Sequence, residues 1–90
     1  MAEELADIFT QAEHKAIHDK IATLEDLRLL GGEAVSIDET GGQVIFVMPP
    51  EDAPPRYAIR KRKGIFYLLS GSALAVVTTG PLDKILEALP

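Results

Sequence analysis

The stretch RYAIRKRKGIFYLL, residues 56–69, decides the fold of this chain. Two runs of strand-forming residues flank Lys63-Gly64, and glycine readily takes the positive φ that a two-residue hairpin turn requires. Such a turn fixes which residues of the two strands face each other. The expected pairs are Arg62–Ile65, Arg60–Tyr67 and Ala58–Leu69 on one face of the sheet, and Ile59–Leu68 and Lys61–Phe66 on the other face.

The sequence around this hairpin predicts an α+β domain with an antiparallel meander between two helices. Helix-forming residues without Gly or Pro precede Gly31-Gly32, which predicts a long N-terminal helix. Pro81 stands at the favoured first position of a short closing helix. We expect one domain over residues 1–90, with helices over 2–30 and 81–89 and strands over 33–39, 43–48, 56–62, 65–69 and 74–79.

The apolar stripe of the long helix changes direction along its length. The first group of apolar residues ends at Ala16, and the group that begins with Ile17 lies about a third of a turn away at 100° per residue. Either the helix kinks near Thr23, where Thr23 and Asp26 resemble a capping box, or one long helix contacts two surfaces.

Two further turns, Gly41-Gly42 and Gly71-Ser72, extend the register to the whole sheet. With two-residue turns at both places, one face forms a core for the helices. Its residues are Val35, Ile37, Phe46, Met48, Tyr57, Ile59, Phe66, Leu68 and Val77. The opposite face carries Ile45, Val47, Ile65, Tyr67, Leu69, Leu74 and Val76, bordered by Arg56, Arg60 and Arg62.

A second apolar sheet face needs a cover, because a solvated face of an antiparallel sheet is normally polar. Large exposed apolar patches mark interaction sites, and Tyr and Arg are enriched where binding energy concentrates. The closing helix could cover this face in a three-layer monomer, a second copy could pair with it in a homodimer, or another protein could bind it. The partner-binding candidates are Ile45, Val47, Arg60, Arg62, Tyr67, Leu69 and Val76.

The amino-acid composition and net charge exclude several kinds of site and partner. The chain has 90 residues, 47% of them apolar, a net charge of −5 and no cysteine, which excludes disulfides and thiolate metal sites. The acidic net charge argues against the chain as a whole binding a nucleic acid or an anionic membrane. We expect a cytoplasmic protein. Residues 56–90 nevertheless carry 6 basic and 2 acidic side chains, which favours an acidic protein surface as the target.

Chemistry-bearing motifs are sparse. His14 and His18 are four residues apart, so a helix places both imidazoles on one face, as a metal site requires. Neither a third histidine nor a cysteine is present to complete such a site, so these two residues are weak candidates and we expect no cofactor. No nucleophile has a matching base in sequence reach, and we expect no enzymatic activity.

The order of a long acidic helix, an antiparallel meander and a short closing helix resembles the frataxin-like fold. That resemblance implies iron binding by the acidic helix, at Glu3, Glu4, Asp7 and Asp19, although the tryptophan of the family's sheet has no counterpart here. The first hypothesis is therefore a non-catalytic protein–protein interaction module, such as an adaptor, an inhibitor or a small chaperone. The alternative is a protein that loosely binds iron or another divalent metal.

Overall fold

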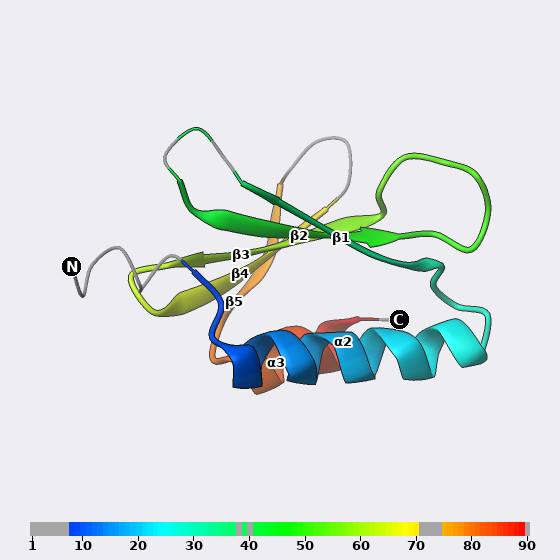
Figure 1. The fold of residues 1–90 in the computed structure, drawn as a ribbon, viewed down its shortest axis with the longest axis horizontal. Coiled ribbons are helices and arrows are strands. Elements are labelled where there is room, and N and C mark those ends of the chain that lie inside the picture. The colour runs from blue at the N-terminus through cyan, green and yellow to red at the C-terminus, as the bar shows by residue number, and fades with distance from the viewer. Residues whose placement is uncertain (1–7, 38, 40, 71–74, 90) are drawn as a thin grey trace.

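A helix, five strands and a second helix follow one another in the computed structural model, which describes residues 8–37, 39, 41–70 and 75–89. The elements are α2 (Gln11–Asp26), β1 (Gly32–Ile37), β2 (Gln43–Met48), β3 (Tyr57–Arg62), β4 (Ile65–Ser70), β5 (Val76–Gly80) and α3 (Leu82–Ala88) (Figure 1). The strands form one antiparallel sheet in the order β1-β2-β3-β4-β5. The predicted α+β class and meander are confirmed.

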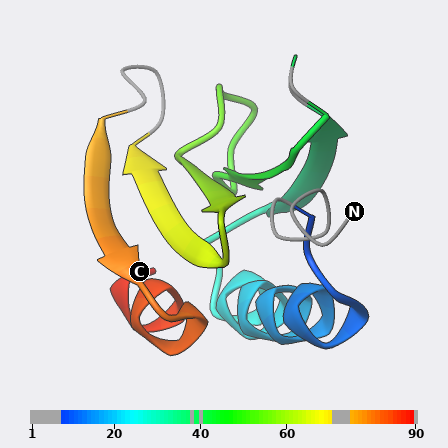
Figure 2. The same ribbon diagram turned by 90° about the vertical axis from the view of Figure 1, so that its left-hand side faces the viewer.

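Both helices lie on the same face of the sheet, side by side (Figure 2). They enclose one apolar core with that face, to which α2 contributes Ile17, Ile21 and Leu24 and α3 contributes Ile85. The sheet residues of this core are Ile45, Val47, Ile59, Phe66 and Leu68. Within the described residues the molecule therefore has two layers, and the three-layer arrangement with α3 on the opposite face is not found.

Helix α2 is shorter than predicted and begins at a capping box. The Thr10 hydroxyl accepts a hydrogen bond from the Glu13 amide (3.1 Å), and the Glu13 carboxylate accepts one from the Thr10 amide (2.8 Å). The apolar stripe changes direction because Phe9 packs on the core from outside the helix. Of the two alternatives, a kink near Thr23 is not found, because α2 runs as one element through this residue. The helix ends before Gly31, close to Arg28 with its positive φ of 61°. Residues 2–7 of the predicted helix lie outside the described residues.

The β3–β4 hairpin has the predicted register. Lys63 and Gly64 both take positive φ, 51° and 80°, as the type I′ turn of a two-residue hairpin requires. All five predicted cross-strand pairs are present, including Arg60–Tyr67 and Lys61–Phe66. The faces of β3 and β4 are therefore those expected from the sequence.

The β1–β2 register differs from the prediction, which exchanges the two faces of β2. Ile37 pairs with Gln43 rather than with Phe46, so residues 38–42 connect the strands instead of Gly41-Gly42 alone. The shift of three positions is odd, and an odd shift turns every side chain of a strand to the opposite face. Phe46 and Met48, predicted in the core, thus share the opposite face with Ala58, whereas Ile45 and Val47 lie in the core.

Three other residues predicted in the core are exposed. Val35 and Ile37 share the helix side with Ile45 but are 45% and 60% exposed, since they belong to an edge strand. Val77 is 52% exposed and falls at a bulge, because Leu68 pairs with Thr78 while Leu69 pairs with Val76. The predicted Gly71-Ser72 turn and Leu74 lie outside the described residues.

Candidate functional site

The face of the sheet that points away from α2 and α3, here called the outer face, is the first candidate site. The cross-strand pairs place two rows of side chains on it. One row runs Ala34, Phe46, Ala58, Leu69 and Val76, and the next runs Ser36, Val44, Arg60, Tyr67 and Thr79. No described helix lies over these rows (Figure 2).

The outer face has a small apolar cluster of its own. Val44, Ala58 and Leu69 are buried in it, and the half-buried rings of Phe46 and Tyr67 pack against them. Farther out along one row, Val76 remains 57% exposed. Local packing of neighbouring side chains therefore shields the centre of this face, while its rings and its β5 edge remain accessible.

A shallow hollow of about 350 Å³ opens on the outer face, and it is lined by Arg60, Arg62, Tyr67 and Leu69. The hairpin register brings these residues together, because Arg60 lies opposite Tyr67 and Arg62 lies one place farther along the same face. The hollow combines two guanidinium groups, an aromatic ring and an aliphatic wall. Such a surface suits a ligand with both acidic and apolar groups.

Two of the seven predicted partner-binding residues lie elsewhere. Ile45 and Val47 are fully buried beneath the helices, so their predicted place on the outer face is wrong. The structure places the other five, Arg60, Arg62, Tyr67, Leu69 and Val76, on the outer face. Val44 and Phe46 take the positions that the incorrect β2 register had assigned to Ile45 and Val47.

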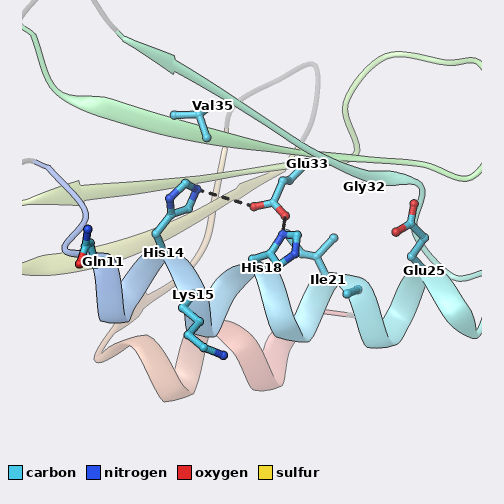
Figure 3. A pocket seen from close by; sticks show the side chains of 10 residues that line it. Gln11, His14, Lys15, His18, Ile21, Glu25, Gly32, Glu33 and Val35 are labelled. Carbon is cyan, nitrogen blue, oxygen red and sulfur yellow. Dashed lines mark hydrogen bonds and ion pairs between the residues drawn. The ribbon is translucent and has the colours of Figure 1, made fainter.

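The second candidate site is a groove of about 660 Å³ between α2 and the edge strand β1 (Figure 3). Ile21, Ala22 and Val35 give it apolar walls, and polar side chains from both elements line the rest. His14 and His18, four residues apart on α2, both face Glu33 of β1 in Figure 3. The predicted common face of the two imidazoles is thus present.

Glu33 stands between the two imidazoles. His18 Nδ1 lies 2.6 Å from Glu33 Oε1, and His14 Nε2 lies 3.9 Å from Glu33 Oε2. Glu33 is a site residue that was not predicted from the sequence. The alternation of residues along β1 could have indicated it, because this alternation puts Glu33 on the same face as Val35 and therefore against the helix.

A partly buried ion pair beside the core connects α2 to β3. Lys61 Nζ donates to Glu13 Oε1 at 2.8 Å and to the Ile8 carbonyl at 3.3 Å, and it lies 5.5 Å from the centre of the Phe66 ring. Burial opposes ionisation of Glu13, but the hydrogen bonds from Lys61 and the Thr10 amide outweigh it and lower the pKa of Glu13. This pair connects two elements and faces neither candidate site.

Of the four acidic positions that the frataxin-like resemblance implies for iron binding, only Asp19 lies among the described residues. Glu3, Glu4 and Asp7 lie outside the described residues. Asp19 is bound to Lys15 at 2.7 Å, and this hydrogen bond lowers the pKa of Asp19.

Among the described helices, none is long and apolar enough to cross a membrane.

Comparisons of the chain with protein-family models, with curated proteins and with solved structures found no match. The resemblance to the frataxin-like fold therefore rests on element order alone. The chemistry of the two sites is therefore the basis for inferring a function.

Proposed function

We propose that this chain is a non-catalytic, cytoplasmic protein-interaction module whose outer face binds an acidic and apolar segment of another protein. One observation carries the proposal: both helices lie on one face of the sheet, and the opposite face holds an apolar cluster beside two arginines. Exposed apolar surface rimmed by charge is typical of protein-binding sites. An adaptor, an inhibitor or a small chaperone would each use such a face.

The chemistry of the partner follows from the hollow. Arg60 and Arg62 offer planar guanidinium groups that bind carboxylates in a bidentate manner. Tyr67 offers an aromatic ring with a polar tip, and Leu69 closes the apolar wall. We therefore assign as partner a segment in which Asp or Glu stands next to an aromatic or aliphatic residue. The net charge of −5 for the whole chain opposes a polyanion such as a nucleic acid.

A displayed library of random peptides tests this assignment. Peptides are selected on the full chain and counter-selected on the double variant Arg60→Glu/Arg62→Glu, with Lys63→Glu at the hairpin turn as the matched charge control. We expect enriched peptides to carry acidic and apolar residues together. They should bind the chain and the Lys63→Glu variant alike, and bind the double variant at least about tenfold more weakly, as loss of charged contacts implies.

Amide chemical shifts measured with one enriched peptide locate its site on the chain. Changes at Tyr67, Leu69 and Val76 would support the outer face, whereas changes confined to α2 and β1 would contradict it. Peptides without acidic residues would refute the assigned partner chemistry. A dimer in light scattering that Arg60→Glu/Arg62→Glu dissociates would replace the assigned partner by a second copy of the chain.

A further inference from the structure

One oxygen of the Glu33 carboxylate is buried and accepts no hydrogen bond from the described part of the chain. The Glu33 side chain is 14% exposed, and its Oε2 atom has no hydrogen-bond partner among the described residues. Leaving a buried charged acceptor unsatisfied costs free energy, so native structures rarely do it without a water or an ion at that position. Glu33 Oε2 is turned towards the groove between α2 and β1, where His14 stands (Figure 3).

The distances around Glu33 fit an ion better than a second hydrogen bond. His14 Nε2 is 3.9 Å from Glu33 Oε2, which is too long for a hydrogen bond. Two ligands of one tetrahedral zinc ion lie roughly 3.4 Å apart, because each stands about 2.0–2.1 Å from the metal. A small approach of the exposed His14 side chain would therefore bring both atoms onto one ion.

We propose that His14, His18 and Glu33 form a binding site for one zinc ion. Two imidazoles and one carboxylate are a ligand set that zinc uses, with water in the fourth position. Histidines at positions i and i+4 of a helix lie on the same face, and β1 supplies the third ligand from across the groove.

The proposed site would form only when zinc binds, because two of its three ligands contact each other in this structure. Among the described residues no three ligating side chains already surround a common point, and here the 2.6 Å contact joins Glu33 directly to His18. Zinc would replace this contact: Glu33 would release the His18 ring, and both would turn to the ion. The side chains of His14 and His18 are 49% and 65% exposed, so neither has to break core packing to do so.

The residue next to His14 argues for zinc binding without catalysis. Lys15 follows His14 at the position where His-Glu-x-x-His zinc enzymes carry their catalytic glutamate, and it is bound to Asp19. Zinc at this position would connect α2 to the edge strand β1 and stabilise the folded chain in proportion to its affinity. The site thus differs from the outer face in both place and chemistry.

Calorimetric titration of the full chain, freed of any affinity-tag histidines, with ZnCl₂ tests the proposal. We expect one zinc ion per chain and a higher melting temperature in its presence. His14→Ala, His18→Ala and Glu33→Gln should each weaken binding by more than about tenfold, the smallest loss expected even for outer-shell partners of a metal. Glu25→Gln is the matched control, because Glu25 lines the same groove without touching the three ligands.

The same variants give the results that would overturn the site. Absence of both heat and a melting shift in the unaltered chain would refute it. An equal loss in Glu25→Gln and Glu33→Gln would show diffuse attraction to acidic residues instead. Far-ultraviolet circular dichroism of the metal-free variants establishes that they are folded, and visible absorption of Co²⁺ in place of zinc reports whether the imidazoles coordinate the metal.

Discussion

Lys61 shows how a single charged residue can be placed in a small apolar core. Its side chain is 8% exposed, and its ammonium group is held by Glu13 and by the Ile8 carbonyl above the ring of Phe66. Burial of an ammonium group is tolerated only where such partners replace its water. Lys61 therefore connects the segment before α2, the first turn of α2 and strand β3.

Replacing Lys61 with methionine keeps the volume of the side chain but removes its charge. We expect Lys61→Met to lower the free energy of unfolding by about 2 kcal/mol, since a hydrogen bond to a charged group contributes roughly 1.5–3 kcal/mol. Urea denaturation measures the change, with the exposed Lys63→Met as control. If the double variant Glu13→Gln/Lys61→Met loses as much free energy of unfolding as the two single variants together, the two side chains are not coupled.

Glu13 makes stability depend on acid pH. Its pKa is lowered in the folded chain, so its contribution is complete above the pKa of the unfolded chain, roughly 4.3, and is lost as pH falls through the lower folded value. We expect the free energy of unfolding to decrease from about pH 5 to pH 3, and to decrease less steeply in Glu13→Gln. Denaturation curves at several pH values measure both slopes. Equal slopes in the two proteins would show that Glu13 is not responsible.

At the scale of the elements, turn chemistry explains which strands could be placed from the sequence. Lys63-Gly64 forms the two-residue turn that its glycine indicates, and a turn of this length fixes the cross-strand pairs, so the β3–β4 register was predictable. Residues 44–48 are all apolar and contain no alternation that would distinguish their two faces. The β2 register then depended on the length of the preceding connection alone, and Ile45 and Val47 were assigned to the wrong face.

The connection after β2 passes directly over the start of β1. The Gly31 amide donates to the Met48 carbonyl at 2.8 Å, and a Cβ atom on Gly31 would lie 2.1 Å from the carbonyl oxygen of Pro49. This obstacle is backbone, so it cannot move as the end of a side chain can. Gly31 is therefore required by close approach rather than by a left-handed conformation.

Gly31→Ala should lower the free energy of unfolding by about 3 kcal/mol, the upper end of the usual cost of overpacking. Gly41→Ala is the control, because a Cβ there would meet nothing within 4 Å and only its positive φ of 85° is unfavourable. That strain costs about 1–2 kcal/mol. Urea denaturation compares the two, and a larger loss in Gly41→Ala would mean that the Pro49 segment moves freely away from Gly31.

At the scale of the whole molecule, the position of α3 determines where a partner could bind. The sequence predicted the short closing helix but could not show which face of the sheet it covers, since apolar residues stood on both faces. In the structure α3 lies beside α2, and Ile85 is buried in the same core. The candidate outer face follows from this arrangement. The groove between α2 and β1 does not involve α3, and its Glu33 comes from the strand that directly follows α2 in the chain.

The two faces can be distinguished by introducing one charge into each. Val47 is fully buried on the helix side, whereas Val76 is 57% exposed on the outer face. We expect Val47→Asp to destabilise the chain by more than about 4 kcal/mol, because it buries an unpaired carboxylate. Val76→Asp should change the free energy of unfolding by no more than about 0.5 kcal/mol, as is usual for exposed positions. Thermal and urea denaturation measure both. A tolerated Val47→Asp would mean that β2 has the opposite register and that Val47 belongs to the outer face. The hollow beside Arg60 would then have different walls, and the residues of the proposed partner site would have to be reassigned.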